Sequence, residues 1–180
     1  MKLIYSIPDK LYYIQNFLDY SSYKKIHYDV FRNNSILLKS TEKTWKDFLK
    51  YGFKNFVKNT SLDTNNKLIQ KIKILLENNS FYKIKFNNFQ PSIFSMQDGA
   101  GINWHDDNPY EYGITYYINR RWNHKFGGEF LFKNTSNNGF IPLIGNSLII
   151  IKAPLLHKVT PVMKSIVPRK TIQIFVDKKK

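Results

Sequence analysis

Residues 91–118 read PSIFSMQDGAGINWHDDNPYEYGITYYI, and this stretch decides the fold class. Two short apolar segments, residues 91–96 and 113–118, flank the turn-rich sequences QDGAG and DDNPYEYG, which predicts two strands separated by irregular breaks. The same succession of short apolar segments and turn residues continues downstream and predicts further strands at residues 129–133, 147–152 and 171–176. Many short strands with Gly and Asn breaks are typical of sandwiches, barrels and jelly rolls.

The sequence upstream of residue 91 changes in character. Tyr82, Ile84 and Phe86 alternate with polar residues, which predicts one more half-buried strand. Residues 1–80 instead show helical spacing, with one helix predicted to begin at Pro8-Asp9 and a second to follow the cap residues 63–65. The apolar faces of these helices are Leu11, Ile14, Phe17 and Leu18 in the first, and Leu68, Ile69, Ile72, Leu75 and Leu76 in the second.

Residues 22–60 fit no single pattern. Residues 36–38 suit a strand, whereas Trp45, Phe48, Leu49 and Phe53 suit a short helix. No repeat or linker divides the 180-residue chain, so we predict a single domain over residues 1–180. In this interpretation residues 1–80 form a mostly helical support and residues 81–180 form the catalytic core. The fold class is α+β, mainly β, with the N-terminal helices packed on one sheet of a barrel-like core.

The charge is strongly positive, with 28 Lys and Arg against 13 Asp and Glu and a formal net charge of +15. Such an excess is typical of proteins that bind nucleic acid or an anionic surface. Here it is spread over both halves of the chain. Most of the basic residues are Lys, which shares A/T-rich codons with Asn, Ile, Tyr and Phe, and these are abundant too. Charge alone therefore does not favour nucleic acid as the partner.

The chain has no cysteine, which excludes a disulfide scaffold, a cysteine-ligated metal site and a catalytic thiol. The first fifteen residues, MKLIYSIPDKLYYIQ, contain no apolar segment of the kind found in signal peptides. The longest apolar run, residues 148–151, is far shorter than the roughly 20 residues of a membrane span. We expect a cytoplasmic protein without a membrane partner.

Two histidines and one aspartate carry the candidate chemistry. His105 and Asp107 are two residues apart in the sequence WHDD, so on an extended strand end their side chains point the same way. His157 follows the apolar strand 147–152 and a Pro154 turn, which places it to supply a third ligand from another strand. Two histidines and one carboxylate form the facial triad that holds non-haem Fe(II) and leaves the opposite face open.

A candidate residue for binding a carboxylate lies twelve residues after His157. Arg169 begins the last predicted strand, and its guanidinium offers a fork for a carboxylate. Thr171 and Gln173 share its face by the two-residue period of a strand, so a hydroxyl and an amide lie beside the cation. This arrangement predicts a place for a small dicarboxylate next to the metal.

Over residues 90–176 the chain resembles the Fe(II)/2-oxoglutarate-dependent dioxygenase superfamily, and within it the prolyl 4-hydroxylase-like group. Three blocks in order carry the resemblance. The first is DGAGINWHDDNP at residues 98–109, similar to the glycine turn and H-x-D of the family. The second comprises YYIN at 116–119, Trp122 and GGEF at 127–130. The third comprises Pro142, GNSL at 145–148, HKVTPV at 157–162 and RKT at 169–171.

The resemblance implies a double-stranded β-helix (jelly roll) fold and a role for each matching residue. His105, Asp107 and His157 are implied to bind Fe(II), and Arg169 to pair with the distal carboxylate of 2-oxoglutarate with help from Thr171. Tyr117 is implied to lie near the same carboxylate, the alternative being a core tyrosine. The Gly127-Gly128 pair is interpreted only as a turn before a strand. The implied cofactors are Fe(II) and 2-oxoglutarate as cosubstrate, with ascorbate as an optional addition.

The chain departs from the family at two places. Phe94-Ser95-Met96 stands where a tyrosine is common, which removes one expected hydroxyl contact to the cosubstrate. The last strand lacks the second arginine typical of nucleic-acid-repairing members, and Asp107 argues against halogenation. The implied activity is hydroxylation of a C–H bond, foremost in a peptidyl residue such as proline, with release of succinate and CO₂. The alternatives are the same chemistry on a free amino acid, another small molecule or a nucleic acid, or a non-catalytic jelly-roll binding module.

Overall fold

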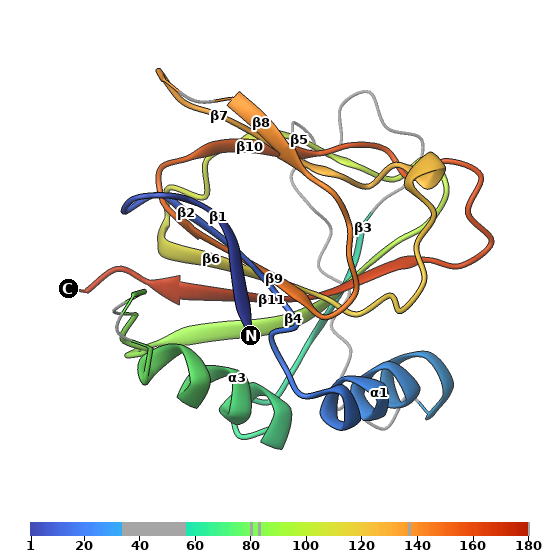
Figure 1. Ribbon diagram of the computed structural model, residues 1–180, viewed down its shortest axis with the longest axis horizontal. Coiled ribbons are helices and arrows are strands. Elements are labelled where there is room, and N and C mark those ends of the chain that lie inside the picture. Colours follow the sequence, from blue (N-terminus) through green and yellow to red (C-terminus); the bar gives the residue numbers. More distant parts are fainter. Residues whose placement is uncertain (34–56, 80, 83, 137, 180) are drawn as a thin grey trace.

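The computed structural model describes residues 1–33, 57–79, 81–82, 84–136 and 138–179. Two antiparallel sheets lie one above the other, and two helices lie below the larger sheet (Figure 1). The elements are, in chain order, β1 (Lys2–Ile7), β2 (Leu11–Gln15), α1 (Tyr20–Tyr28), η1 (Asp29–Asn33), β3 (Val57–Ser61), α3 (Lys67–Glu77), β4 (Phe89–Met96), β5 (Ile102–His105), β6 (Tyr110–Tyr117), η2 (His124–Phe126), β7 (Phe130–Lys133), β8 (Asn138–Ile141), β9 (Ser147–Lys152), β10 (Leu156–Val159) and β11 (Arg169–Asp177).

The strand order is that of a jelly roll. In the described residues the larger sheet runs β1-β2-β9-β6-β11-β4-β3, and the smaller sheet runs β5-β10-β7-β8. Neighbouring strands come from distant parts of the chain, and successive strands from β4 onward mostly alternate between the two sheets. The predicted fold class, mainly β with a double-stranded β-helix core and a helix-covered sheet, is confirmed.

The helices cover the outer face of the larger sheet. In α3 the Asn66 side chain caps the first turn by accepting a hydrogen bond from the Leu68 amide at 3.0 Å. The helix then buries Ile69, Ile72 and Leu76 against the sheet. This confirms the helix predicted after residues 63–65 and the face it buries. No helix among the described residues has the length and apolar character needed to cross a membrane.

A second apolar layer fills the space between the two sheets. One cluster includes Ile149 and Ile151 of β9 with Phe130 and Phe132 of β7. A separate cluster gathers seven buried residues around the other end of the barrel, namely Val57, Phe94, Met96, Ala100, Ile102, Val159 and Val162. Apolar burial at about 25 cal/mol per Å² makes these layers the main stabilising term and fixes how the sheets face each other.

The prediction of a helix beginning at Pro8 is wrong, because Leu11–Gln15 forms strand β2. Leu11 and Tyr13 pack between the sheets, while Ile14 packs toward the helices. A strand buried on both faces loses its two-residue period, and its apolar residues then mimic helical spacing. The described part of residues 1–80 thus contains the strands β1, β2 and β3 beside its helices.

The strand predicted around Tyr82, Ile84 and Phe86 is also wrong in type. All three side chains are buried as expected, but the described residues of this segment form turns and irregular backbone. They cover the end of the helix layer instead of joining a sheet. The expected strand at 36–38 and the expected helix around Trp45–Phe53 lie outside the described residues.

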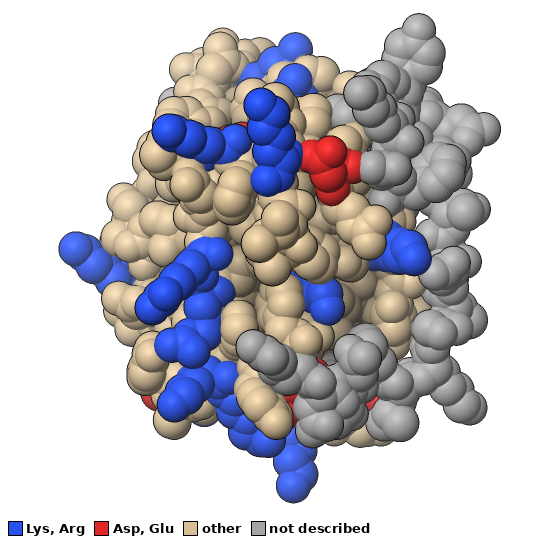
Figure 2. All heavy atoms as spheres, turned by 90° about the vertical axis from the view of Figure 1, so that its right-hand side faces the viewer, with Lys and Arg blue, Asp and Glu red and all other residues tan. Residues whose placement is uncertain are grey.

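The five strands predicted from residue 91 onward correspond to β4, β6, β7, β9 and β11. Strands β5, β8 and β10, each of only four residues, were not predicted from the sequence. On the face shown in Figure 2, Lys and Arg outnumber Asp and Glu and lie in separate groups with uncharged residues between them. This distribution agrees with the even spread of charge along the sequence.

Asn146 ties the start of β9 to the chain that follows β2. Its Oδ1 accepts hydrogen bonds from the Leu18 amide at 2.9 Å and from the Tyr116 hydroxyl at 3.0 Å. Its Nδ2 donates to the Leu18 carbonyl at 2.8 Å. The backbone of Asn146 has a φ of 59°, a left-handed conformation that asparagine tolerates better than most residues. One buried side chain therefore satisfies three buried polar groups.

We predict that Asn146→Ala lowers the free energy of unfolding by about 2–4 kcal/mol, because it leaves buried polar groups without partners at about 1–3 kcal/mol each. Urea denaturation measures the change. Asn87→Ala, at an exposed position, is the control and should leave the free energy unchanged. A loss below about 1 kcal/mol for Asn146→Ala would contradict this account of the β9 junction.

Candidate metal and carboxylate site

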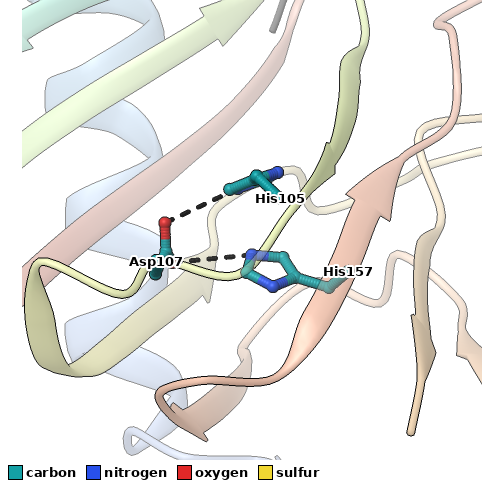
Figure 3. A group of neighbouring side chains, drawn as sticks. All are labelled: His105, Asp107 and His157. Atoms are coloured by element: carbon teal, nitrogen blue, oxygen red, sulfur yellow. Dashed lines mark ion pairs between the residues drawn. The ribbon is translucent and has the colours of Figure 1, made fainter.

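Three side chains meet at one end of the barrel interior (Figure 3). Asp107 lies between the two imidazoles, with its Oδ1 3.6 Å from His105 Nε2 and its Oδ2 3.5 Å from His157 Nε2. One ligand atom of each residue lies within 4.8 Å of the others. The structure thus brings together the three residues that the sequence predicts as ligands, and the group can hold a metal ion.

Strand pairing positions the two imidazoles. His105 is the last residue of β5, and His157 lies directly opposite it on the antiparallel strand β10. The two ring centroids are 4.1 Å apart, and the Phe130 ring stacks on His157 at 5.0 Å. Side chains of directly opposed residues point to the same face of a sheet, here the barrel interior.

The position of Asp107 differs in detail from the extended geometry expected from the sequence. Strand β5 ends at His105, and Asp107 has a φ of 54° in the turn that follows. This left-handed residue turns the carboxylate back toward the imidazoles. Gly113 makes room for it, because a Cβ at this position would lie 2.8 Å from Asp107 Oδ2. The need for glycine at residue 113 was not recognised in the sequence, where it reads as the start of a strand.

Backbone carbonyls fix the tautomers of both histidines. His105 Nδ1 lies 2.7 Å from the Asn103 carbonyl, and His157 Nδ1 lies 2.7 Å from the Leu155 carbonyl. A carbonyl only accepts hydrogen bonds, so each Nδ1 carries the proton and each Nε2 presents its lone pair toward Asp107. Burial lowers the pKa of His105, which keeps its ring in the neutral form that binds metals.

The triad opens into a narrow pocket that also reaches Arg169. Phe94, Ile102 and Phe130 give it apolar walls. Thr115 and Gln173 also line it, and the Thr115 hydroxyl donates to Gln173 Oε1 at 2.5 Å. The amide predicted to lie beside the cation is thus held by its neighbour on β6.

Arg169 is a buried cation with only 2% of its surface exposed. Its Nε donates to the Gly128 carbonyl at 3.0 Å, its Nη1 lies 3.3 Å from Met96 Sδ, and its guanidinium lies 5.2 Å from the centroid of the Tyr117 ring. No carboxylate of the described residues lies within ion-pair distance of it. The Glu129 carboxylate acts on this guanidinium only from beyond ion-pair distance. A bound anion would therefore offset part of the cost of burying the charge.

No hydrogen bond of good geometry reaches two buried hydroxyls, those of Tyr117 and Thr171. The Tyr117 hydroxyl lies close enough to Arg169 for this cation to act on its pKa against the effect of burial. The two residues lie opposite each other on β6 and β11. Burial raises the pKa of the Tyr117 hydroxyl to about 12, so at neutral pH it is an uncharged donor. Unpaired buried hydroxyls next to an unpaired cation are what a carboxylate ligand would satisfy.

Gly128 does more than form a turn. It has a φ of 79°, and a Cβ there would lie 2.9 Å from Arg169 Cδ, so glycine allows the guanidinium stem to pass. Its carbonyl also orients that guanidinium. Met96, at the place where the family often has a tyrosine nearby, contributes its sulfur to the same cation. In the sequence Gly128 is recognisable only as one of two adjacent glycines, which indicate a turn and hence a positive φ.

No family model and no curated protein matches the sequence. Solved structures do match the fold. A prolyl-4-hydroxylase from Pseudomonas putida superposes with a TM-score of 0.72 at 11% identity, covering 96% of this chain and 94% of that one. A prolyl hydroxylase from Trichoplax adhaerens, in complex with a hypoxia inducible factor peptide fragment, gives 0.72 at 17% identity, covering 94% and 84%. A 2OG-Fe(II) oxygenase family oxidoreductase from Burkholderia pseudomallei gives 0.62 at 14% identity, covering 93% and 85%.

At these identities the likeness is one of fold. It extends over almost the whole chain, including the N-terminal strands and helices that the sequence blocks do not cover. The chain therefore has the fold of the 2OG-Fe(II) oxygenases and, within them, of the prolyl-4-hydroxylase-like group.

Proposed function

We propose that the protein is an Fe(II)- and 2-oxoglutarate-dependent dioxygenase that hydroxylates a C–H bond, most readily in a peptidyl residue such as proline. His105, Asp107 and His157 would hold the iron, and Arg169, Thr171 and Tyr117 would hold the distal carboxylate of 2-oxoglutarate. The observation that carries the proposal is the buried Arg169 without a described counter-ion, beside two unpaired hydroxyls, in the same pocket as the His–Asp–His group.

The donor set suits this assignment. Two neutral imidazoles and one carboxylate are the ligands preferred by non-haem Fe(II), and they occupy one side of the ion. When bound, iron and 2-oxoglutarate supply the oxidising power for oxygen insertion, and the cosubstrate leaves as succinate and CO₂. The chain's own residues bind and orient these groups. Phe94, Ile102 and Phe130 line the space between the triad and Arg169 and would limit the access of water to it.

A peptide is the favoured substrate class. One structure with the same fold is a prolyl hydroxylase described in complex with a peptide fragment, and that likeness supports a peptide here. Succinate formation with a panel of proline-containing peptides, free amino acids and oligonucleotides, run with Fe(II) and ascorbate, tests the choice. Stimulation by amino acids or oligonucleotides alone would move the substrate assignment. No succinate with any of them, together with no Fe(II) binding, would favour a binding module.

We predict that His105→Ala, Asp107→Ala and His157→Ala each weaken Fe(II) binding on the order of 100-fold or more and abolish succinate formation, because each removes one of three ligands. Anaerobic Fe(II) titration and circular dichroism separate lost binding from lost folding. His124→Ala is the matched control, since this exposed imidazole on η2 lies outside the group. Wild-type Fe(II) affinity in Asp107→Ala would rule out the ligand assignment.

We predict that Arg169→Lys lowers the affinity for 2-oxoglutarate about 10- to 100-fold, because a charged hydrogen-bonded fork contributes about 1.5–3 kcal/mol. Anaerobic calorimetry on the Fe(II)-loaded protein measures this affinity, with Arg120→Lys, at an exposed arginine, as control.

We predict that Tyr117→Phe weakens the binding of 2-oxoglutarate about 3- to 10-fold in the same measurement. It should not destabilise the free protein, since no hydrogen bond of good geometry holds the hydroxyl there. A fall in the stability of the free Tyr117→Phe protein would contradict this expectation.

The two glycines allow the two halves of the site to be separated. We predict that Gly113→Ala displaces Asp107 and weakens Fe(II) binding, whereas Gly128→Ala displaces Arg169 and weakens 2-oxoglutarate binding at unchanged Fe(II) affinity. The same anaerobic titrations measure both constants, and each variant is the control for the other. Equal effects of both substitutions on Fe(II) would mean that the glycines act through general stability.

A further inference from the structure

The smaller sheet has a second face, turned away from the pocket. His105 and His157 point into the barrel, so the adjacent residues Trp104 and Lys158 point outward. Lys133 on β7 points to the same side. The ammonium group of Lys133 lies 4.7 Å from the centroid of the Trp104 ring, and that of Lys158 lies 5.2 Å from it. Two lysines from two strands therefore approach one indole.

These two cations have no counter-ion in the part of the chain that the structure describes. Neither ammonium lies within ion-pair distance of a described carboxylate, and no hydrogen bond of either to a described residue is seen. Attraction to the indole offsets part of their repulsion, at about 0.5–1 kcal/mol per exposed cation–π contact. An anionic group placed between them would remove the repulsion and gain two charged hydrogen bonds.

Leucines alternate with these lysines. In the antiparallel register of β7 and β10, Leu156 lies opposite Lys133, and Lys158 lies opposite Leu131. Phe140 of β8 lies opposite Leu131 and is 67% exposed. The result is a checkerboard of apolar and cationic side chains. Both described α-helices lie against the other sheet (Figure 1).

We propose that the outer face of the smaller sheet is a docking surface for an extended acidic polypeptide segment whose sheet-facing side chains, every second residue, are alternately acidic and apolar. In such a segment the side chains on one side recur about every 6–7 Å, a spacing close to that of the sheet beneath. Its carboxylates would meet Lys133 and Lys158, and its apolar side chains would meet Leu131, Leu156 and Phe140. The surface is separate from the pocket and does not depend on the proposed chemistry.

The pattern favours a peptide over nucleic acid. A nucleic-acid surface presents basic residues in a continuous track and aromatic rings open to base stacking. Here each lysine is followed across the ladder by a leucine, and the Trp104 ring is already in contact with two ammonium groups. Leucines in this number leave little room for successive phosphate contacts.

The test is fluorescence anisotropy with a dye-labelled peptide SESLSESLS, measured on the metal-free protein. Two peptides serve as controls. SELELSSSS has the same composition but places its acidic and apolar residues on opposite sides of the extended chain, and SKSLSKSLS has reversed charge. The decisive variant is Lys133→Glu/Lys158→Glu. Its matched control is Lys24→Glu/Lys67→Glu, which changes the net charge equally at exposed positions on α1 and α3. Lys133→Gln/Lys158→Gln serves if the charge reversal prevents folding.

We expect SESLSESLS to bind more tightly than either control peptide. Lys133→Glu/Lys158→Glu should weaken this binding at least about 10-fold, and Lys24→Glu/Lys67→Glu should change it by less than about 2-fold, because screening limits distant surface charges. Equal losses in both double variants would show only diffuse attraction to a basic protein and overturn the proposal. Equal binding of SELELSSSS would overturn it too, as would tighter, steeply salt-dependent binding of oligo(dT) lost on Lys133→Glu/Lys158→Glu.

Because the measurement needs no iron, its failure leaves the dioxygenase assignment untouched, and failure of that assignment leaves the docking result intact.

Discussion

The antiparallel pairing of β5 with β10 is the constraint on which the site depends. It sets His105 directly opposite His157. The carbonyl of Asn103 in β5 and that of Leu155, just before β10, orient the two rings. Neither strand has more than four residues, so their place is determined by the sheets around them. The apolar layer between the sheets therefore stabilises the geometry of the imidazoles as well as the fold.

Arg169 poses the complementary problem of a charge inside that apolar layer. The fold accommodates it with neutral partners, namely the Gly128 carbonyl, the Met96 sulfur and the face of Tyr117. These orient the guanidinium without neutralising it. A fully satisfied arginine would be more stable but would have nothing left for a ligand. The unpaired hydroxyls of Tyr117 and Thr171 follow the same logic, since stability is given up where a binding partner recovers it.

Sequence reasoning succeeded where the signal is local. The 3.6-residue stripe of α3 follows from its one buried face, and β4, β6, β9 and β11 are short apolar segments between turn residues. Both signals were recognised in the sequence. It failed at β2, where burial on both faces removed the period, and around Ile84, where burial without strand pairing imitated it. In the site, the charged and polar residues could be named from the sequence, because few residue types perform such chemistry. The glycines at 113 and 128 could not, since their role is the space they leave for side chains distant in the sequence.

The smaller sheet shows why function and stability need not be in conflict here. Alternation along a strand sends one residue inward and the next outward, so Trp104 and Lys158 take their positions from the same backbone that fixes His105 and His157. Side chains on the outer face can therefore be substituted without loss of the two histidines, provided that the pairing of β5 with β10 is kept. A surface of this kind can diversify among proteins whose pocket chemistry stays the same, because side chains on opposite faces of one strand contribute to different free energies.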